Sequence, residues 1–360
     1  MQPTVEPLTD RPVTPLLEEQ LRYFTTEAMH VQPVMEFIPE KAAERLGIAE
    51  GTRLLGADFG GDKGAVRLFK IQNGQLVTQD DYKDDIQGDN GAGYLDTIKR
   101  AAAFAAEQGI PLGISWGAPL DGTKPLYHPK AKTFLEELQA EFGGDMAAIS
   151  PSITSVVNDG PAGAIAGAMA AYQQTGADNV IFVINGGGLG SSIILNGTLY
   201  AAEAGHVEGI EALNTYHQTE PCGVYNATYV CLERLGANKA GIEAQWQAET
   251  GSYMRARDIE DRYKEGNQLA ADLYEHSAEV VAHIIQGIAD NQGMSLVDGK
   301  TAIVAHGGAF KFPHYGERIA QILAAHNDQA IELLMTKDFG AADSNACLDG
   351  SAIAALYASN

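Results

Sequence analysis

The sequence has few cysteines and no long apolar run. Three cysteines, Cys222, Cys231 and Cys347, stand in 360 residues, too few for the disulfide framework of a secreted protein. No apolar run approaches the roughly 18 to 20 residues that span a bilayer. The N-terminus, MQPTVEPLTDRP, carries early acids instead of the basic and apolar regions of a signal peptide. We therefore expect a cytoplasmic protein with no membrane partner.

Basic residues are also scarce. The chain has 24 Lys and Arg against 47 Asp and Glu, a formal net charge of −23. A field of that sign repels nucleic acid at long range, so we expect no nucleic-acid partner. The same negative field also repels an anionic nucleotide. A site for ATP would therefore have to use backbone N–H groups, helix N-termini and Mg²⁺ instead of a basic surface.

The N-terminal region reads as an extension ahead of the main fold. Residues 1–14 hold three of the fourteen prolines and predict an extended arm. Apolar spacing predicts helices over 16–29 and 39–46. The segment 41–55, KAAERLGIAEGTRLL, also resembles part of a helix-turn-helix. Its second half runs straight into a predicted strand, LLGADFGG, so a helix that packs on the main fold is the favoured interpretation.

Two similar strand-rich units follow residue 53. RLLGADFGG, AVRLFKI and QLVTQDDY read as strands, the last two joined at Asn73-Gly74, a dipeptide typical of tight hairpins. NVIFVINGGGLGSSIIL and TLYAA repeat the pattern around Asn196-Gly197. This internal duplication predicts two mixed α/β lobes that face a cleft.

The remaining segments complete these lobes. Helices are predicted over 93–108 and 133–142 and for AGAIAGAMAAY and DGSAIAALYAS, with strands at PLGISWGAPL, SITSVVND, TAIVAHGG and near AIELLMT. The chain beyond residue 226 is otherwise predicted to be mostly helical. We predict four parts: a mostly helical extension (1–52), an N-terminal lobe (53–172), a C-terminal lobe (173–345) and a last helix (346–360) that packs back on the first lobe.

Two glycine-rich segments each follow a predicted strand. They read Asp58-Phe59-Gly60-Gly61-Asp62-Lys63-Gly64 and Gly186-Gly187-Gly188-Leu189-Gly190-Ser191-Ser192. Glycine turns between strands are common, and either one alone is weak evidence for a ligand. Their repetition in two similar units favours a pair of loops whose backbone N–H groups hold a polyphosphate.

Polar residues follow at two further points. Asn158 and Asp159 lie between a predicted strand and a helix, where an acid can act as a base or simply cap the helix. Taken alone, the residues favour the cap. Glu203, His206 and Glu233 follow the second glycine loop and can bind sugar hydroxyls, or can belong to a solvated turn.

Six motifs in order resemble the ROK family of sugar kinases over residues 53–358. They are LLGADFGGDKGAVR, GISWGAPLDG, VVNDGPAGA, INGGGLGSSIILNGTLY, EAGH with CLE, and AIVAHGGAFKF. The resemblance implies an α/β, two-lobed actin-like ATPase (ribonuclease H-like) fold with an interlobe cleft. It also implies transfer of the ATP γ-phosphoryl group to a hexose.

The same resemblance assigns residue roles. It implies Asp159 as the general base and Asp58 as the residue that orients Mg²⁺ through water. The implied sugar contacts are Asn158, Glu203, His206 and Glu233. The implied nucleotide and phosphate contacts are Asp58, Gly60, Gly61, Asp62, Lys63, Gly186, Gly187, Gly188, Gly190, Gly307 and Gly308.

Several alternatives stay open. A glucose-like hexose is the favoured substrate of this hexokinase-like enzyme, with an N-acetylhexosamine as the second candidate. The donor can be ATP, another nucleotide or polyphosphate, and a homodimer is a further hypothesis. A sugar-binding regulator or pseudokinase on the same fold is the alternative from another functional class.

The sequence departs from the family pattern at three places. Asp62 and Gly187 stand where relatives usually have threonine. Many relatives bind structural zinc through a histidine and three closely spaced cysteines. The available residues here are His206, His217, Cys222 and Cys231, with nine positions between the cysteines instead of about five, and Glu220 in place of another cysteine. This incomplete ligand set predicts that zinc is not bound.

Overall fold

The computed structural model describes residues 15–60, 63–87, 89–126, 128, 130–213, 230–312, 314–336 and 345–359. The chain forms two compact units. The first unit consists of Pro33–Val180, Ile193–Ala201 and Thr336–Asn360, and the second of Met1–Gln32, Ile181–Ser192 and Ala202–Met335. The lobe boundaries predicted at residues 53, 173 and 346 stay a prediction.

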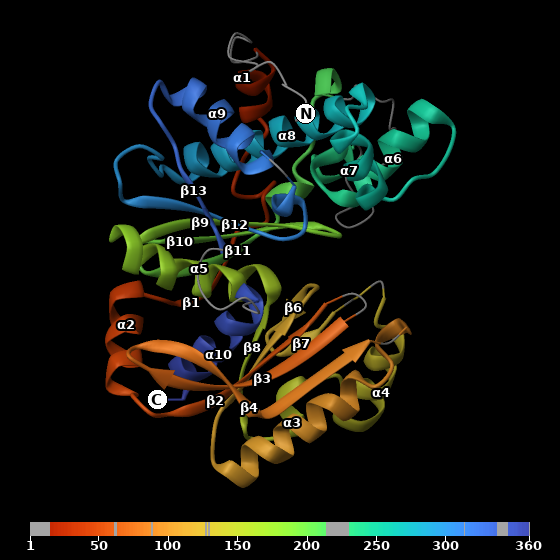
Figure 1. Ribbon diagram of the computed structural model, residues 1–360. Helices are drawn as coiled ribbons and strands as arrows, with labels where there is room; N and C mark the ends of the chain where they lie inside the picture. Colours follow the sequence, from red (N-terminus) through yellow and green to blue (C-terminus); the bar gives the residue numbers. More distant parts are fainter. Residues whose placement is uncertain are drawn as a thin grey trace. The chain divides into compact units, whose positions relative to one another are not determined.

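The first unit is built on a five-stranded sheet of order β4-β3-β2-β5-β8 (Figure 1). Its strands are β2 (Arg53–Phe59), β3 (Lys63–Gln72), β4 (Gln75–Gln87), β5 (Leu112–Trp116) and β8 (Ile153–Asn158). β2, β5 and β8 are parallel, with Phe59 opposite Trp116 and Trp116 opposite Asn158. Their carboxyl ends therefore meet at one edge of the sheet, where a ligand site is expected in α/β folds.

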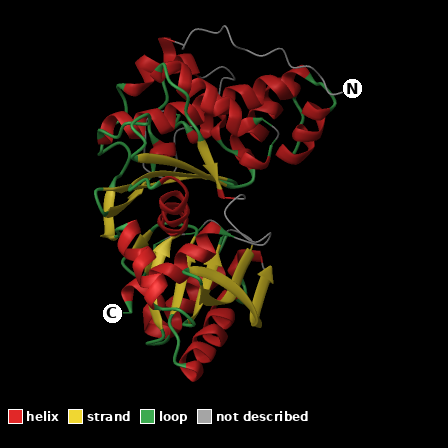
Figure 2. Ribbon diagram, turned by 60° about the vertical axis from the view of Figure 1, so that its left-hand side comes forward, coloured by secondary structure: helices red, strands yellow, loops and turns green. Residues whose placement is uncertain are grey.

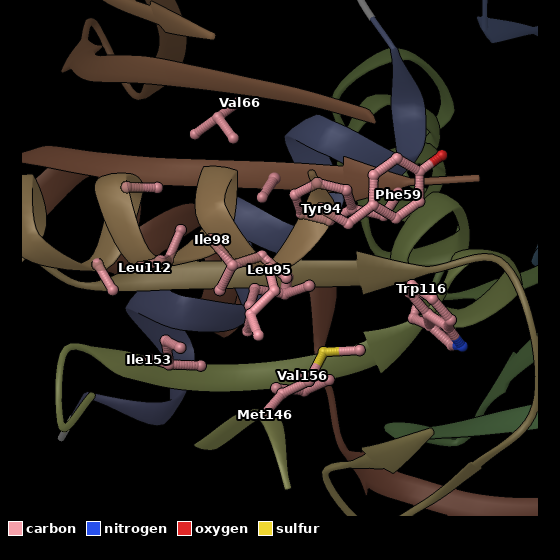
Figure 3. Close-up of a cluster of buried hydrophobic side chains, with 14 of the residues drawn as sticks. Phe59, Val66, Tyr94, Leu95, Ile98, Leu112, Trp116, Met146, Ile153 and Val156 are labelled. Carbon is pink, nitrogen blue, oxygen red and sulfur yellow. The ribbon is translucent and has the colours of Figure 1, made fainter. Parts of the chain in front are cut away.

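Helices cover both faces of this sheet. α3 (Tyr94–Gln108) and α4 (Lys132–Phe142) pack apolar side chains on one face, where they meet apolar side chains of the strands in a buried cluster, part of which Figure 3 shows. α10 (Ala346–Ala358) packs against β2, β5 and β8, and also against α5 (Asp159–Thr175). A Cβ at Gly113 would overlap the backbone of Ser351, so this glycine is what lets α10 approach the sheet closely. The rest of the unit includes α2 (Pro39–Ile48), β6 (Leu120–Asp121), β7 (Lys124–Pro125), η1 (Asp89–Gly91) and η2 (Met146–Ile149).

The second sheet has the order β1-β11-β10-β9-β12-β13. Its strands are β1 (Gln32–Glu36), β9 (Asn179–Asn185), β10 (Leu189–Leu195), β11 (Thr198–Ala202), β12 (Thr301–His306) and β13 (Leu333–Met335). Both predicted Asn-Gly hairpins are confirmed. Asn73 and Gly74 have φ of 53° and 70°, and Asn196 and Gly197 have φ of 50° and 77°. Positive φ at both central residues is the geometry that this dipeptide favours.

The second unit is mainly helical (Figure 2). Its longest helix, α8, buries most of its length, and no helix in the described ranges combines the length and apolarity needed to cross a membrane. The helices are α1 (Pro15–Leu21), α6 (Lys239–Thr250), α7 (Ala256–Lys264), α8 (Gln268–Gln292) and α9 (Tyr315–Asn327), with the short turns η3 (Ala204–His206), η4 (Glu211–Leu213), η5 (Glu233–Ala237) and η6 (Ala309–Lys311).

Two details of the N-terminal region differ from the prediction. The helix predicted over 16–29 ends at Leu21, and Thr25 then accepts a hydrogen bond from the N–H of Ala28 in a local turn. Threonine side chains favour such turns over helix interiors. The strand β1 was not predicted, because its residues are mostly exposed and show no apolar alternation. The helix over 39–48 is confirmed as a packing helix, since residues 53–59 form β2 instead of a recognition helix.

Candidate active site

Asp58 lies near the carboxyl end of β2 and is held from two sides. Ser115 Oγ on β5 donates to its Oδ1 at 2.7 Å, and Asn345 Nδ2, at the start of α10, donates to its Oδ2 at 2.8 Å. Desolvation raises the pKa of Asp58, while these two hydrogen bonds oppose the rise. Neutral donors thus orient the carboxylate without neutralising its charge.

Asp159 is the first residue of α5, directly after β8. It keeps partial solvent exposure, yet desolvation first and the charge of Asp58 second raise its pKa to about 7. Its Oδ1 accepts from the N–H of Gly160 at 2.8 Å. A carboxyl that titrates near neutral pH, at the sheet edge where ligands bind, has the property expected of a general base.

The N-cap of α5 is Asn158, whose Oδ1 accepts from the N–H of Gly160 at 3.1 Å. Its Nδ2 donates to the carbonyls of Trp116 and Ala118 at 3.2 and 2.9 Å. Both amide hydrogens are therefore engaged within the protein. Asn158 can offer a ligand only the remaining lone pair of Oδ1.

The first glycine loop begins at Gly60. The N–H of Gly60 donates to the carbonyl of Lys63 at 2.9 Å, and Tyr94 donates to the carbonyl of Gly60 at 3.0 Å. A Cβ at Gly117 would lie 3.2 Å from Gly60 Cα and 3.7 Å from Asp159 Oδ2. Gly117 thus leaves the space between the loop and the acid open.

Two residues assigned to this loop, Gly61 and Asp62, lie outside the described residues. Lys63 is the exposed first residue of β3. The structure therefore places Asp58, Gly60, Asn158 and Asp159 together at one sheet edge of the first unit.

The second glycine loop joins β9 to β10 in the second unit. The N–H of Gly186 donates to the carbonyl of Gly188 at 2.9 Å, and the N–H of Lys239 donates to the carbonyl of Gly186 at 3.4 Å. A Cβ at Gly187 would meet nothing within 4 Å, whereas one at Gly190 would lie 2.8 Å from Ile184 Cγ2. Gly190 is thus required by packing, and Gly187 is not.

His206 and Glu233 form a pair beside this loop. His206 Nε2 lies 3.6 Å from Glu233 Oε2, and Asn238 Nδ2 donates to Glu233 Oε1 at 2.6 Å. Glu233 also accepts from the N–H of Leu189, and desolvation raises its pKa. Its Oε1 is 3.7 Å from the position of a Cβ at Gly188. The carboxylate therefore adjoins the second glycine loop.

His206 is neutral at neutral pH despite its carboxylate neighbour. Desolvation first, and then electrostatic interactions with His30 and Arg234, lower the pKa of His206 to about 4. The 3.6 Å approach to Glu233 is therefore a contact of a neutral imidazole and not an ion pair. Such a ring can both donate and accept hydrogen bonds, which suits a hydroxyl-bearing ligand.

Glu203 lies one short turn before His206. Its N–H donates to the carbonyl of Met29 at 2.7 Å, and its carbonyl accepts from the N–H of His206 at 2.9 Å. A Cβ at Gly205 would lie 2.8 Å from the carbonyl oxygen of Leu189. The turn that holds Glu203 and His206 thus packs closely on the start of β10.

Gly307 and Gly308 follow β12. Gly307 has φ of 112°, and a Cβ there would overlap the backbone carbonyl of Asn185, so only glycine fits. A Cβ at Gly308 would meet nothing within 4 Å. Asn185 Nδ2 donates to the carbonyl of Ala237 at 2.5 Å and to the hydroxyl of Tyr315 at 3.2 Å. This buried amide therefore connects the end of β9 to η5 and α9.

The implied magnesium site fits Asp58. Each of its carboxylate oxygens already accepts one hydrogen bond, which favours contact through a water over direct coordination. Mg²⁺ commonly keeps several waters when it binds to proteins.

The implied zinc site is not testable in full. His217 and Cys222 lie outside the described residues. Among the residues that the structure does describe, no three His, Cys, Asp or Glu side chains gather as metal ligands. Cys231 is buried and forms an isolated β-bridge with Glu208. The prediction that zinc is not bound stays a prediction.

Sequence reasoning missed several residues that hold these groups. Ser115 and Asn345 orient Asp58, and Asn185, just before the second glycine loop, donates to Ala237 and Tyr315. Ser115 could have been suspected, because it lies in the GISWG segment, one of the recognised motifs. Nothing in the sequence connects Asn345 to Asp58, 287 positions away.

Comparisons with known proteins identify the family of the chain. The family model described as "ROK family" matches residues 54–350. A ROK hexokinase from Thermus thermophilus is 18% identical with a TM-score of 0.61, over 85% of this chain and 98% of that one. A ROK family glucokinase from Streptomyces griseus, in complex with glucose and AMPPNP, is 20% identical with a TM-score of 0.56, over 85% of this chain and all of that one.

One further structure covers more of the chain. A ROK family transcriptional regulator, a homolog of the E. coli MLC protein, is 17% identical with a TM-score of 0.55, over 95% of this chain and 87% of that one. No curated protein matches the chain in a sequence search. The structural likenesses confirm the α/β fold of the actin-like ATPases. Because the family model covers most of the sequence, the chain belongs to the ROK family.

Proposed function

We propose that the protein is a sugar kinase that transfers the γ-phosphoryl group of ATP to a hydroxyl of a glucose-like hexose. The observation that carries this proposal is Asp159. Its carboxyl lies at the ligand-binding edge of the sheet, beside a glycine loop, with a pKa of about 7. A base with that pKa is ionised in about half of the molecules at neutral pH and can still accept a proton readily.

In the proposed reaction, the sugar hydroxyl attacks the γ-phosphorus of ATP. A new O–P bond forms, the bond to the bridging oxygen of ADP breaks, and the hydroxyl proton moves to the Asp159 carboxylate. Ser115 and Asn345 orient Asp58, and desolvation first and the charge of Asp58 second raise the pKa of Asp159. The enzyme's contribution is otherwise positioning and electrostatic stabilisation, as expected for phosphoryl transfer.

Sugar recognition is assigned to Asn158, Glu203, His206 and Glu233. The neutral His206 ring can donate to one hydroxyl and accept from another, while Glu233 accepts only. Asn158 contributes the free lone pair of its side-chain oxygen. These residue types suit a glucose-like hexose, and they suit an N-acetylhexosamine as well, since both carry neighbouring hydroxyls.

Nucleotide binding is assigned to the two glycine loops, to Gly307 with Gly308, and to Asp62 and Lys63. The proposed contacts are backbone N–H groups of the loops other than those of Gly60 and Gly186, which donate to Lys63 and Gly188. Binding by backbone N–H groups suits a chain with a net charge of −23. When bound beside Asp58, Mg²⁺ would offset negative charge on the phosphates. The donor can be ATP, another nucleotide or polyphosphate.

The test is ADP release, measured with a coupled assay, across a panel of hexoses and N-acetylhexosamines. We expect sugar-dependent ADP release with one or a few of them. The alternative, a sugar-binding regulator or pseudokinase, is favoured by Asp62 and Gly187, which replace threonines usual in relatives. Sugar binding by calorimetry without ADP release from any panel member would favour that alternative.

A further inference from the structure

The N-terminal segment 17–31 is an integral part of the second unit, although the family model begins only at residue 54. Leu17, Phe24 and Met29 are buried there, and so is the polar side chain of Gln20, which is 0% exposed. Burying a glutamine is costly unless both ends of its amide are hydrogen-bonded. The hydrogen-bond partners of Gln20 therefore identify the part of the chain that this segment stabilises.

Both ends of the Gln20 amide bind the chain just after His206. Its Nε2 donates to the carbonyl of Glu208 at 3.0 Å, and its Oε1 accepts from the N–H of Ile210 at 3.0 Å. The amide thus pairs with backbone groups two residues apart, as a neighbouring strand would. It fixes residues 208–210 through their main chain.

Residues 207–209 in turn hold the segment that leads to Glu233. The N–H of Gly209 donates to the carbonyl of Val230 at 2.9 Å, and the N–H of Leu232 donates to the carbonyl of Val207 at 3.0 Å. These bonds join the chain after His206 to the chain before Glu233. Gln20 therefore supports a backbone pairing that brings the chain after His206 beside the chain before Glu233.

A second contact reaches the other side of the same turn. The carbonyl of Met29 accepts from the N–H of Glu203 at 2.7 Å. The next residue, His30, has φ of 48°, an uncommon conformation outside glycine, and interacts electrostatically with His206. Segment 17–31 therefore contacts residues 203–210 at both ends.

The segment has its own anchor on α8. The ring of Phe24 lies on Gly287, where an added Cβ would overlap it. Asn291 Nδ2 donates to the carbonyl of Phe24 at 3.0 Å, and Thr26 Oγ1 donates to Asn291 Oδ1 at 3.2 Å. Because α8 is a long buried helix, it provides a rigid base for the contacts to residues 203–210.

We infer that segment 17–31 positions the sugar-binding residues, with Gln20 and the Met29 carbonyl holding the turn that carries Glu203, His206 and the approach to Glu233. The inference rests on the proposed function, since it assigns this N-terminal segment a part in sugar recognition. Gln20 is a positioning residue: it binds only the main chain of residues 208 and 210. Its loss should weaken sugar binding more than nucleotide binding.

The test compares Gln20→Leu with Gln286→Leu. Gln286 is a matched control: it is buried in the same unit and also makes two side-chain hydrogen bonds, to Asp290 and Asn327. Amide hydrogen exchange needs no substrate. We expect Gln20→Leu to lose about tenfold or more of the protection at residues 203–213, and Gln286→Leu to keep it.

Steady-state kinetics supply the second measurement. We expect Gln20→Leu to raise KM for the sugar by about fivefold or more, with KM for the nucleotide changed less than about twofold. Gln20→Glu keeps the acceptor for Ile210 and should recover part of the sugar KM. Unchanged exchange protection, or an unchanged sugar KM despite lost protection, would overturn the inference. If the wild-type protein phosphorylates no sugar, the proposed function is contradicted instead. The exchange data alone then test whether Gln20 holds residues 203–213 in place.

Discussion

The two glycine loops follow the same local plan but differ in the polar residue that precedes them. Each loop leaves the end of a strand, enters a second strand and is followed by an Asn-Gly hairpin. The first has Asp58 near the strand end, and the second has Asn185. Asp58 is a carboxyl held by two neutral donors, whereas Asn185 is a neutral amide that donates to Ala237 and Tyr315.

This difference suggests separate roles for the two loops: the first lies beside the proposed catalytic carboxyl, and the second helps to position the substrates. The charge of Asp58 helps to raise the pKa of Asp159 to about 7, so ionisable groups gather around the first loop. Beside the second loop, the buried amide of Asn185 is neutral and holds the backbone at Ala237, and the Glu233 carboxylate also adjoins this loop. We therefore expect substitutions near the first loop to lower kcat, and substitutions near the second to change substrate binding.

The largest effect is expected for Asp159→Asn. The amide keeps the size and one acceptor oxygen but cannot take the hydroxyl proton, so kcat should fall by about 10²- to 10⁴-fold. KM for the sugar should change much less, because the assigned contacts remain. A folded variant that keeps more than about a tenth of the wild-type kcat would contradict the role of Asp159.

Asp159→Asn should also be more stable than the wild type at alkaline pH. The folded-state pKa of Asp159, about 7, lies above its usual value of 3.8. The native state therefore binds the proton more tightly, and stability falls as pH rises from about 4 to 7. Above pH 7 the ionised carboxylate destabilises the fold. Asp159→Asn should thus melt at a higher temperature than the wild type at pH 8, with a smaller difference at pH 5.

A smaller loss is expected for Asn345→Asp. Aspartate can still accept the N–H of Cys347 and cap α10, but it cannot donate to Asp58 and adds a second negative charge there. We expect kcat to fall by about tenfold or more, the scale of losing a hydrogen bond to a charged group. If folded Asn345→Asp, checked by thermal melts, had the same kcat as the wild type, Asn345 would only cap the helix.

Gly187→Thr should have a small effect in the opposite direction. A Cβ there meets nothing within 4 Å, so the threonine hydroxyl usual in relatives can be restored without a clash. We expect KM for the nucleotide to fall by about two- to fivefold, with little change in KM for the sugar. A raised nucleotide KM would show that this loop has adapted to glycine.

The purified protein should not contain stoichiometric zinc. We expect the purified protein to carry less than about half an equivalent of zinc, because the set of His206, His217, Cys222 and Cys231 is incomplete and widely spaced. Elemental analysis measures this directly. Stoichiometric zinc that is lost in Cys222→Ser would contradict the prediction.

Sequence alone predicted the local features of this fold well. Both hairpins follow from Asn-Gly dipeptides, and the strand ends at Phe59, next to Asp58, and at Asn158 follow from apolar runs interrupted by polar residues. The repeat of strand, glycine loop and hairpin was enough to indicate paired loops. Each of these signals lies within a few residues of the feature that it predicts.

Contacts between distant segments could not be predicted. Asn345 reaches Asp58 across 287 positions, and Gln20 reaches Glu208 across 188. Asn158 was assigned to sugar binding, yet its amide hydrogens are used by Trp116 and Ala118, which lie on a segment that only the parallel sheet brings near. Such partners are decided by packing, because no local pattern specifies them.

The most direct test of the central claim is the pH dependence of kcat/KM for the preferred sugar, from pH 5.5 to 8.5. Because kcat/KM reports the ionisation of the free enzyme, and Asp159 must be ionised to accept a proton, we expect the rate to fall below a pKa of about 7. The residual activity of Asp159→Asn should lack this acidic limb. A wild-type profile that stays flat down to pH 5.5, or a limb that survives in Asp159→Asn, would contradict the assignment of Asp159 as the base.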